Sequence, residues 1–149
     1  MLDRPEHLYH GSPGLYKILL PNQGDDWGYA EGRHYGVYAT SNRDIAIAFA
    51  LGAKPDEQGK IERIMDPKYG EKIKMIFHRG HPNFGGKGYV YKLLNKGFAY
   101  TMGTQWVNPN PVKPVEISEI NVEDYLHLFR YATEAEKKEI ERELHDTMK

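Results

Sequence analysis

The sequence of 149 residues contains no cysteine. Disulfide bonds, thiolate catalysis and cysteine-ligated metal sites are therefore excluded, and with no sign of an oxidising compartment we expect a cytoplasmic protein. The longest apolar run, residues 45–51, is far shorter than the roughly 20 residues of a membrane-spanning helix. The N-terminal residues also lack the apolar stretch of a targeting signal, so we expect no membrane partner.

The chain also lacks an excess of charge. Twenty Lys and Arg face 21 Asp and Glu, which gives a formal net charge of −1 and no general electrostatic attraction to nucleic acid. The H-E-x-x-H, G-x-S-x-G and P-loop motifs are absent, which removes support for zinc proteases, serine hydrolases and P-loop nucleotidases. His78 and His81 could offer two metal ligands, but no carboxylate stands near them in the sequence, so we expect a solvated loop and no metal ion.

The most informative stretch is residues 34–50. Residues 37–39 read as a short buried strand, and Ser41, Asn42 and Asp44 are the residue types that cap the start of a helix. The apolar run that follows predicts a buried helix ending at Gly52.

Two aromatic rings belong to this stretch, Tyr38 on the strand and Phe49 in the helix. If both rings line a common hollow, they could hold a flat ligand between them. The alternative is that both rings belong to the core.

The remaining segments predict a mainly β chain. Strand composition occurs at residues 6–10, 73–77, 87–94, 98–102, 105–107, 115–120 and 122–129. Residues 87–94 and 98–102 are expected to pair as a hairpin through Asn95-Lys96-Gly97.

Between the strands we expect other structures. These are a turn at 11–14, a short helix or strand at 15–20, a surface loop at 22–33, and a loop over 53–71 with one helical turn near 61–65. Thr133 and Glu136 form a capping box, which predicts a peripheral helix over about 133–148. This order of elements predicts one α+β domain over residues 1–149.

Two short motifs together resemble a known family. His10-Gly11-Ser12 at a strand end, followed by Gly36-Val37-Tyr38-Ala39 and a helix, is similar to the ADP-ribosyltransferase superfamily in its His-Tyr-Glu branch. That branch includes poly-ADP-ribose polymerases, diphtheria-like toxins and small rifamycin-modifying transferases. The resemblance covers roughly residues 8–52 and, loosely, 87–120. It implies an ADP-ribosyltransferase-like fold of split antiparallel sheets with flanking helices, and NAD as the substrate.

The resemblance also implies roles for individual residues. His10 and Ser12 would contact the ribose on the adenosine side of NAD, and the backbone of Gly11 would hold the nicotinamide amide. Tyr38 would lie against the nicotinamide ring, with Phe49 as the second stacking ring.

The third motif of the family departs from its pattern here. Gln105, ahead of Trp106, stands where the family has a glutamate, and Ala46 stands where polymerases have a serine that holds the nicotinamide amide. A glutamine can still hydrogen-bond a ribose hydroxyl, but it brings no negative charge and cannot act as a base. We therefore expect a slow transferase, a substrate-assisted one, or a binding protein. Glu116 and Glu119 are possible replacements for the missing carboxylate.

The leading hypothesis is a mono-ADP-ribosyltransferase-like protein that acts on an unknown protein, nucleic-acid or small-molecule acceptor. A first alternative is a catalytically silent module that binds NAD or ADP-ribose. A second is an NAD-dependent RNA 2′-phosphotransferase, which would need Arg33, Arg43 and Arg79 to converge on a phosphate. A third is an α+β domain that only binds another protein.

Overall fold

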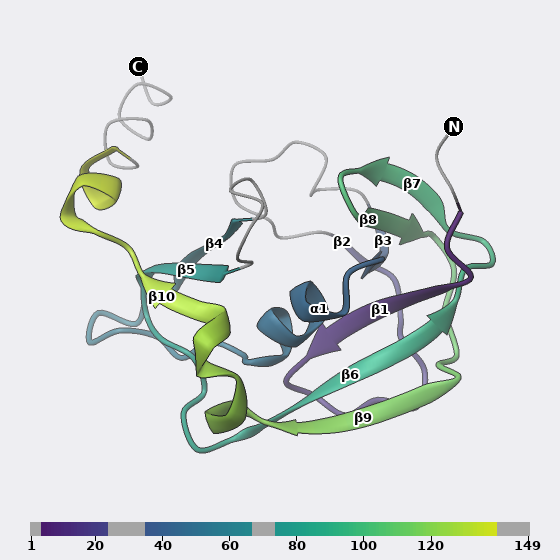
Figure 1. The fold of residues 1–149 in the computed structure, drawn as a ribbon, viewed down its shortest axis with the longest axis horizontal. Helices are drawn as coiled ribbons and strands as arrows, with labels where there is room; N and C mark the ends of the chain where they lie inside the picture. The colour runs from purple at the N-terminus through teal and green to yellow at the C-terminus, as the bar shows by residue number, and fades with distance from the viewer. Residues whose placement is uncertain (1–3, 24–34, 67–73, 140–149) are drawn as a thin grey trace.

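The computed structural model of the chain describes residues 4–23, 35–66 and 74–139. These residues form a seven-stranded sheet, a three-stranded sheet and the helix α1 (Arg43–Ala50), which lies between the two sheets (Figure 1). The strands of the large sheet are β1 (His7–Ser12), β2 (Asn22–Gln23), β3 (Tyr35–Thr40), β6 (Lys87–Leu94), β7 (Ala99–Met102), β8 (Gln105–Asn108) and β9 (Glu116–Asn121). The strands of the small sheet are β4 (Glu62–Asp66), β5 (Lys74–Arg79) and β10 (Phe129–Tyr131). The α+β class is thus confirmed.

The large sheet is antiparallel throughout. Its strand order is β7-β8-β3-β1-β6-β9, and β2 adds to β3. In the small sheet β4 and β5 are antiparallel, whereas β10 pairs with β5 in parallel. The expectation of antiparallel sheets therefore holds for most strand pairs but not for this one.

Alternating side chains along the strands build a core on each face of the large sheet. One core includes Leu8, Val37, Ala39, Leu93 and Trp106. The other core lies under α1 and includes Ile47, Ala48, Phe77, Val90 and Val122. The large sheet is therefore covered on both faces, and α1 is the element that joins it to the small sheet.

The start and end of α1 follow the sequence signals. The Asn42 side chain accepts a hydrogen bond from the Asp44 backbone N–H at 2.9 Å, as an N-cap residue does. Gly52, just beyond the helix, has φ +70°, a left-handed conformation that glycine adopts without steric cost. Both helix boundaries predicted from the sequence are confirmed.

Two glycines of the large sheet allow α1 to approach closely. A Cβ on Gly11 would lie 1.7 Å from the Ala46 carbonyl oxygen, and a Cβ on Gly88 would lie 2.0 Å from the Ala50 carbonyl oxygen. Any side chain at either position would push the helix away from the sheet.

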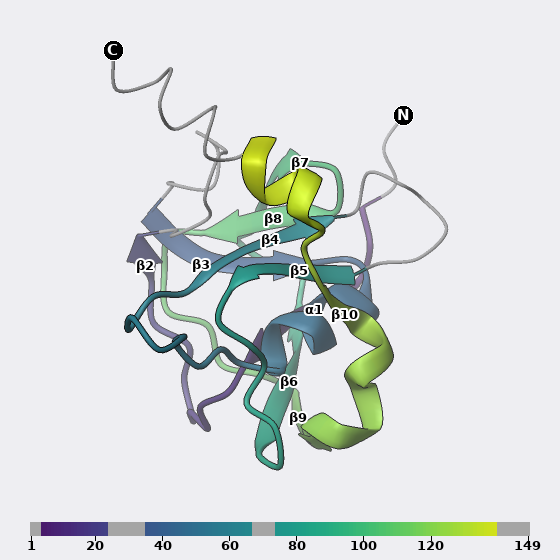
Figure 2. The ribbon, with the colours of Figure 1, turned by 90° about the vertical axis from the view of Figure 1, so that its left-hand side faces the viewer.

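The C-terminal part begins with η2 (Val122–Leu128), a 3₁₀ helix that packs against α1 (Figure 2). A helix then starts at residue 134. The capping box is confirmed, because the Thr133 N–H donates to Glu136 Oε1 at 2.9 Å and the Glu136 N–H donates to Thr133 Oγ1 at 3.2 Å. Residues 140–149 of the expected helix lie outside the described residues. No helix in the described ranges is long and apolar enough to cross a membrane.

The predicted turn at 11–14 is wrong in its first half. Gly11 and Ser12 remain in β1, where they pair with Val90 and Tyr89 of β6. Residues 15–20 form neither a helix nor a strand, and their one sheet-like contact is a bridge between Leu19 and Val112.

The hairpin over residues 87–102 is also wrong. β6 pairs with β1 and β9, and β7 pairs with β8, so the turn at 95–97 leads away from β6. Long-range pairing of β6 with β1 over six residue pairs takes the place of the local alternative.

Two further segments differ from their expected structure. The expected helical turn at 61–65 is strand β4, because it pairs with the strong strand β5. The strand expected over 122–129 is η2 followed by β10. Of the expected loop at 22–33, residues 22–23 form β2, and the rest lies outside the described residues.

Candidate functional site

The large sheet splits between β1 and β3. In the described residues, the two strands share a single residue pair, Tyr9 with Thr40. Beyond that pair, β1 continues along β6 while β3 continues along β8. The split opens at His10, the residue directly after Tyr9.

The His10 imidazole bridges the two strands where they separate. Its Nδ1 lies 2.6 Å from the Tyr38 carbonyl oxygen. Because a carbonyl oxygen can only accept, the proton of the neutral ring must sit on Nδ1. Burial lowers the pKa of His10, and the hydrogen bond to the Tyr38 carbonyl opposes that shift in part. The ring is therefore neutral at pH 7, and Nε2 offers a lone pair to a ligand hydroxyl.

Tyr91 holds the surroundings of His10 in place, a role the sequence alone does not reveal. Its ring centroid lies 5.8 Å from that of His10. Its hydroxyl donates to the Gly14 carbonyl at 2.6 Å and accepts from the Tyr16 N–H at 2.8 Å. Burial raises the pKa of Tyr91, so the hydroxyl stays protonated. Cross-strand register places Tyr91 opposite His10, and no local pattern could have indicated this.

Gln105 lies on the strand next to Tyr38. It pairs with Thr40, the same residue that pairs with Tyr9. The Thr40 and Thr104 hydroxyls are 2.8 Å apart and fasten the start of β8 to the end of β3. His10, Tyr38 and Gln105 thus come from three adjacent strands, and their positions in the register differ by at most two residues.

The amide of Gln105 is incompletely satisfied. Its Nε2 atom is buried and has no hydrogen-bond partner among the described residues. Buried side-chain N–H groups are almost always paired, so a ligand oxygen is a natural partner for this one. This orphaned donor is the observation by which a ribose, with its hydroxyl oxygens, fits the site.

Gly11 and Ser12 follow His10 at the end of β1. The absence of a side chain at Gly11 is already required by the close approach of Ala46, so this glycine has a packing role whatever ligand is present. The Ser12 hydroxyl oxygen accepts from the Gly14 N–H at 3.1 Å. Its own O–H can still donate to a ligand.

Phe49 is partly buried on α1, packed against the core under the helix. The Arg63 guanidinium lies over its ring, 5.8 Å from the centroid, and also donates to the Gly52 carbonyl at 3.2 Å. One face of the Phe49 ring therefore already carries a cation. A stacking role for this ring requires its opposite face or a movement of Arg63.

Neither acidic residue suggested as a replacement for Gln105 can serve. Glu116 lies in the same cross-strand row as Gln105 but four strands away, at about 4.8 Å per strand, or roughly 19 Å. Glu119 lies further along the same distant strand, 3.3 Å from the Lys87 ammonium. The idea that either carboxylate completes the site is wrong.

The two histidines considered for metal binding are not a pair. His78 is buried on β5, while His81 lies in the following loop and stacks on Phe84 with 5.3 Å between ring centroids. Within the described ranges, no group of three or more candidate ligands could hold a metal ion.

Neither a family model, nor a curated protein, nor a solved structure matches the chain.

Proposed function

We propose that the chain binds NAD in the split between β1 and β3 and transfers a single ADP-ribose to an acceptor, as mono-ADP-ribosyltransferases do. The observation that carries the proposal is the hydrogen bond between His10 Nδ1 and the Tyr38 carbonyl across the split, with Gln105 on the strand that pairs with β3. The split of the sheet at that point supports the ADP-ribosyltransferase-like arrangement implied by the resemblance.

Each of these side chains has a role that fits its chemistry. Nε2 of the neutral His10 ring would accept a hydrogen bond from a ribose hydroxyl, and the Ser12 hydroxyl would donate a hydrogen bond to the same ribose. Tyr38 would hold the cationic nicotinamide ring by stacking and cation–π attraction. The buried side-chain amide of Gln105 would form hydrogen bonds with the hydroxyls of the other ribose of NAD, the one that carries nicotinamide.

The reaction breaks the bond between ribose C1′ and the nicotinamide nitrogen, and nicotinamide leaves with the bonding electron pair. The acceptor nucleophile then bonds to C1′ and loses its proton to solvent. Positive charge develops on the ribose in between, and Gln105 offers no negative charge to stabilise it. Loss of one preorganised electrostatic group costs on the order of 100- to 1000-fold in rate, so turnover should be slow.

The test measures NAD binding and nicotinamide release in parallel. We expect His10→Ala to weaken NAD binding, because it removes the acceptor at Nε2 and the bridge to Tyr38. The matched control is His127→Ala, since His127 is exposed on η2. Unchanged NAD affinity in a folded His10→Ala protein, or no NAD binding by the unmodified chain, would refute the proposal.

A catalytically silent NAD-binding module is the second candidate, and Gln105 is the observation that favours it. Saturable NAD binding without nicotinamide release above the spontaneous rate would identify it. The RNA 2′-phosphotransferase alternative has less support. Arg79 is engaged by Asp56 at 2.7 Å, Arg43 lies at the start of α1, and Arg33 is outside the described residues.

A further inference from the structure

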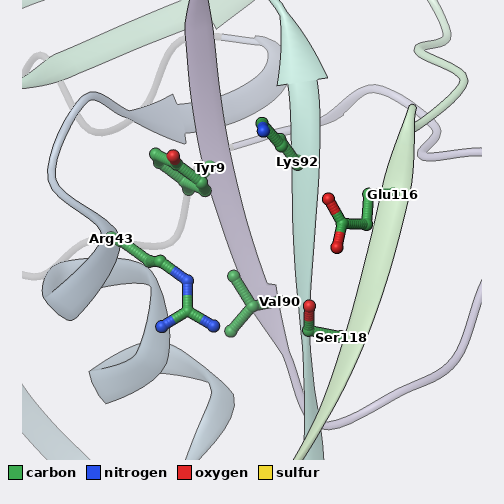
Figure 3. A pocket seen from close by; sticks show the side chains of 6 residues that line it. All are labelled: Tyr9, Arg43, Val90, Lys92, Glu116 and Ser118. Atoms are coloured by element: carbon green, nitrogen blue, oxygen red, sulfur yellow. The ribbon is translucent and has the colours of Figure 1, made fainter.

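A separate hollow lies beside the start of α1, above β6 and β9. Its volume is about 150 Å³, and it is lined by Tyr9, Arg43, Val90, Lys92, Glu116 and Ser118 (Figure 3). The sheet residues come from neighbouring positions of β1, β6 and β9. The hollow is distinct from the split, which lies between β1 and β3.

Charges of opposite sign face each other across this hollow. Val90 is 2% exposed and forms the floor. Arg43 lies on one side of it, and Glu116 and Ser118 lie on the other (Figure 3).

Within the part of the chain that the structure describes, these charges are not neutralised by ion pairs. Among the described residues, Arg43, Lys92 and Glu116 make no ion pair, although Lys92 and Glu116 are directly opposite in the register of β6 and β9. Two cationic groups and one carboxylate are therefore available to a ligand in the same small space.

We propose that this hollow binds a free, small α-amino acid as a zwitterion. The carboxylate of the ligand would lie against the guanidinium of Arg43, and its ammonium group against the carboxylate of Glu116. Charge-assisted hydrogen bonds of this kind are about twice as strong as neutral ones. A cavity of about 150 Å³ is known to hold a molecule as large as benzene, which leaves room for an amino acid of the size of alanine.

The alternative ligand is a simple anion held by Arg43 and Lys92 alone. The arrangement favours the zwitterion, because an anion would leave the Glu116 carboxylate facing the ligand with like charge. This inference does not depend on NAD binding, and its failure would leave the proposed function untouched.

The experiment titrates the full chain with L-alanine, propionate and ethylamine, following backbone amide shifts by NMR. We expect saturable binding of L-alanine that is tighter than that of either half-molecule. Glu116→Gln should weaken L-alanine binding by about tenfold or more, in line with hydrogen bonds to charged groups, and leave propionate unaffected or tighter. Arg43→Gln should weaken both ligands.

Several outcomes would overturn the inference. Binding of propionate as tight as that of L-alanine would identify an anion site. The absence of saturable shifts with any of the three ligands would also overturn the inference. Equal L-alanine affinity in the Glu116→Gln protein would have the same consequence. Both substituted residues are exposed, so the variants should fold, and circular dichroism verifies this.

Discussion

Gln105 is the residue that most limits the proposed chemistry. We expect Gln105→Glu to raise the rate of nicotinamide release by about 100- to 1000-fold, because it restores a carboxylate next to the developing positive charge. The substitution also places a carboxylate at the buried Nε2 position, so some stability should be lost through its desolvation. The measurement is nicotinamide release by chromatography under saturating NAD.

The matched control for this substitution is Gln58→Glu. Gln58 is exposed and contacts the Arg79 side chain, away from β8. We expect no change in rate from the control. A folded Gln105→Glu protein that binds NAD without any gain in rate would mean that the residue is not placed against the reacting sugar.

At the scale of single residues, the sequence predicts candidate site residues but not which residues contact them. His10, Tyr38 and Gln105 can be selected from short motifs, and the structure has them on three adjacent strands. Tyr91 and Arg63 could not be predicted from the sequence, because their partners are not close to them along the chain. Tyr91 contacts His10, which is 81 residues away, and Arg63 contacts Phe49, which is 14 residues away.

At the scale of elements, close contact between α1 and the large sheet depends on two glycines. We expect Gly88→Ala to destabilise the protein by about 1–3 kcal/mol or more, the usual range for overpacking, because its Cβ would lie 2.0 Å from the Ala50 carbonyl oxygen. The free energy of unfolding, measured in urea, tests this.

Gly59 provides the control for glycine replacement in general. A Cβ there would meet no atom within 4 Å, and the remaining cost comes from φ +75°, which is about 1–2 kcal/mol for a left-handed residue. Gly88→Ala should therefore cost more than Gly59→Ala. The opposite order would show that α1 can shift away from β6 without loss.

Helix boundaries with strong local signals were predicted correctly, whereas strand pairings decided by distant partners were not. The cap at Asn42, the stop at Gly52 and the capping box at Thr133 depend on neighbours within a few residues. The hairpin over residues 87–102 failed because β6 finds its partners in β1 and β9, far away in sequence. Turn residues at 95–97 could not reveal that choice.

At the scale of the whole molecule, the free energy of unfolding depends on the protonation of two buried histidines, one on each sheet. The pKa of His10 is lowered by burial, and so is the pKa of His78, for which the nearby Glu136 and Glu62 carboxylates oppose the shift and the Arg130 guanidinium adds to it. His10 lies at the split of the large sheet and His78 on the small sheet. Acid should therefore weaken both parts of the molecule together.

The sign of the effect follows from the direction of these shifts. As the pH falls, a histidine whose pKa is lowered by folding takes up a proton in the unfolded chain before it does so in the folded protein. Its contribution to stability is therefore fully present above the pKa of 6.5 in the unfolded chain, and it is lost as the pH drops below that value. Below the ordinary pKa of 4.5, Glu136 adds to the loss, because its hydrogen bonds with Arg130 and Thr133 hold its pKa at about 2.

We therefore expect the free energy of unfolding to decrease steadily between about pH 7.5 and pH 5, measured by urea titration at constant ionic strength. His78→Gln should reduce the slope, because it removes one of the two groups that bind a proton on unfolding. His127→Gln should not change it, since that side chain is exposed on η2. Constant stability across this range would mean that neither His10 nor His78 is kept neutral by the fold.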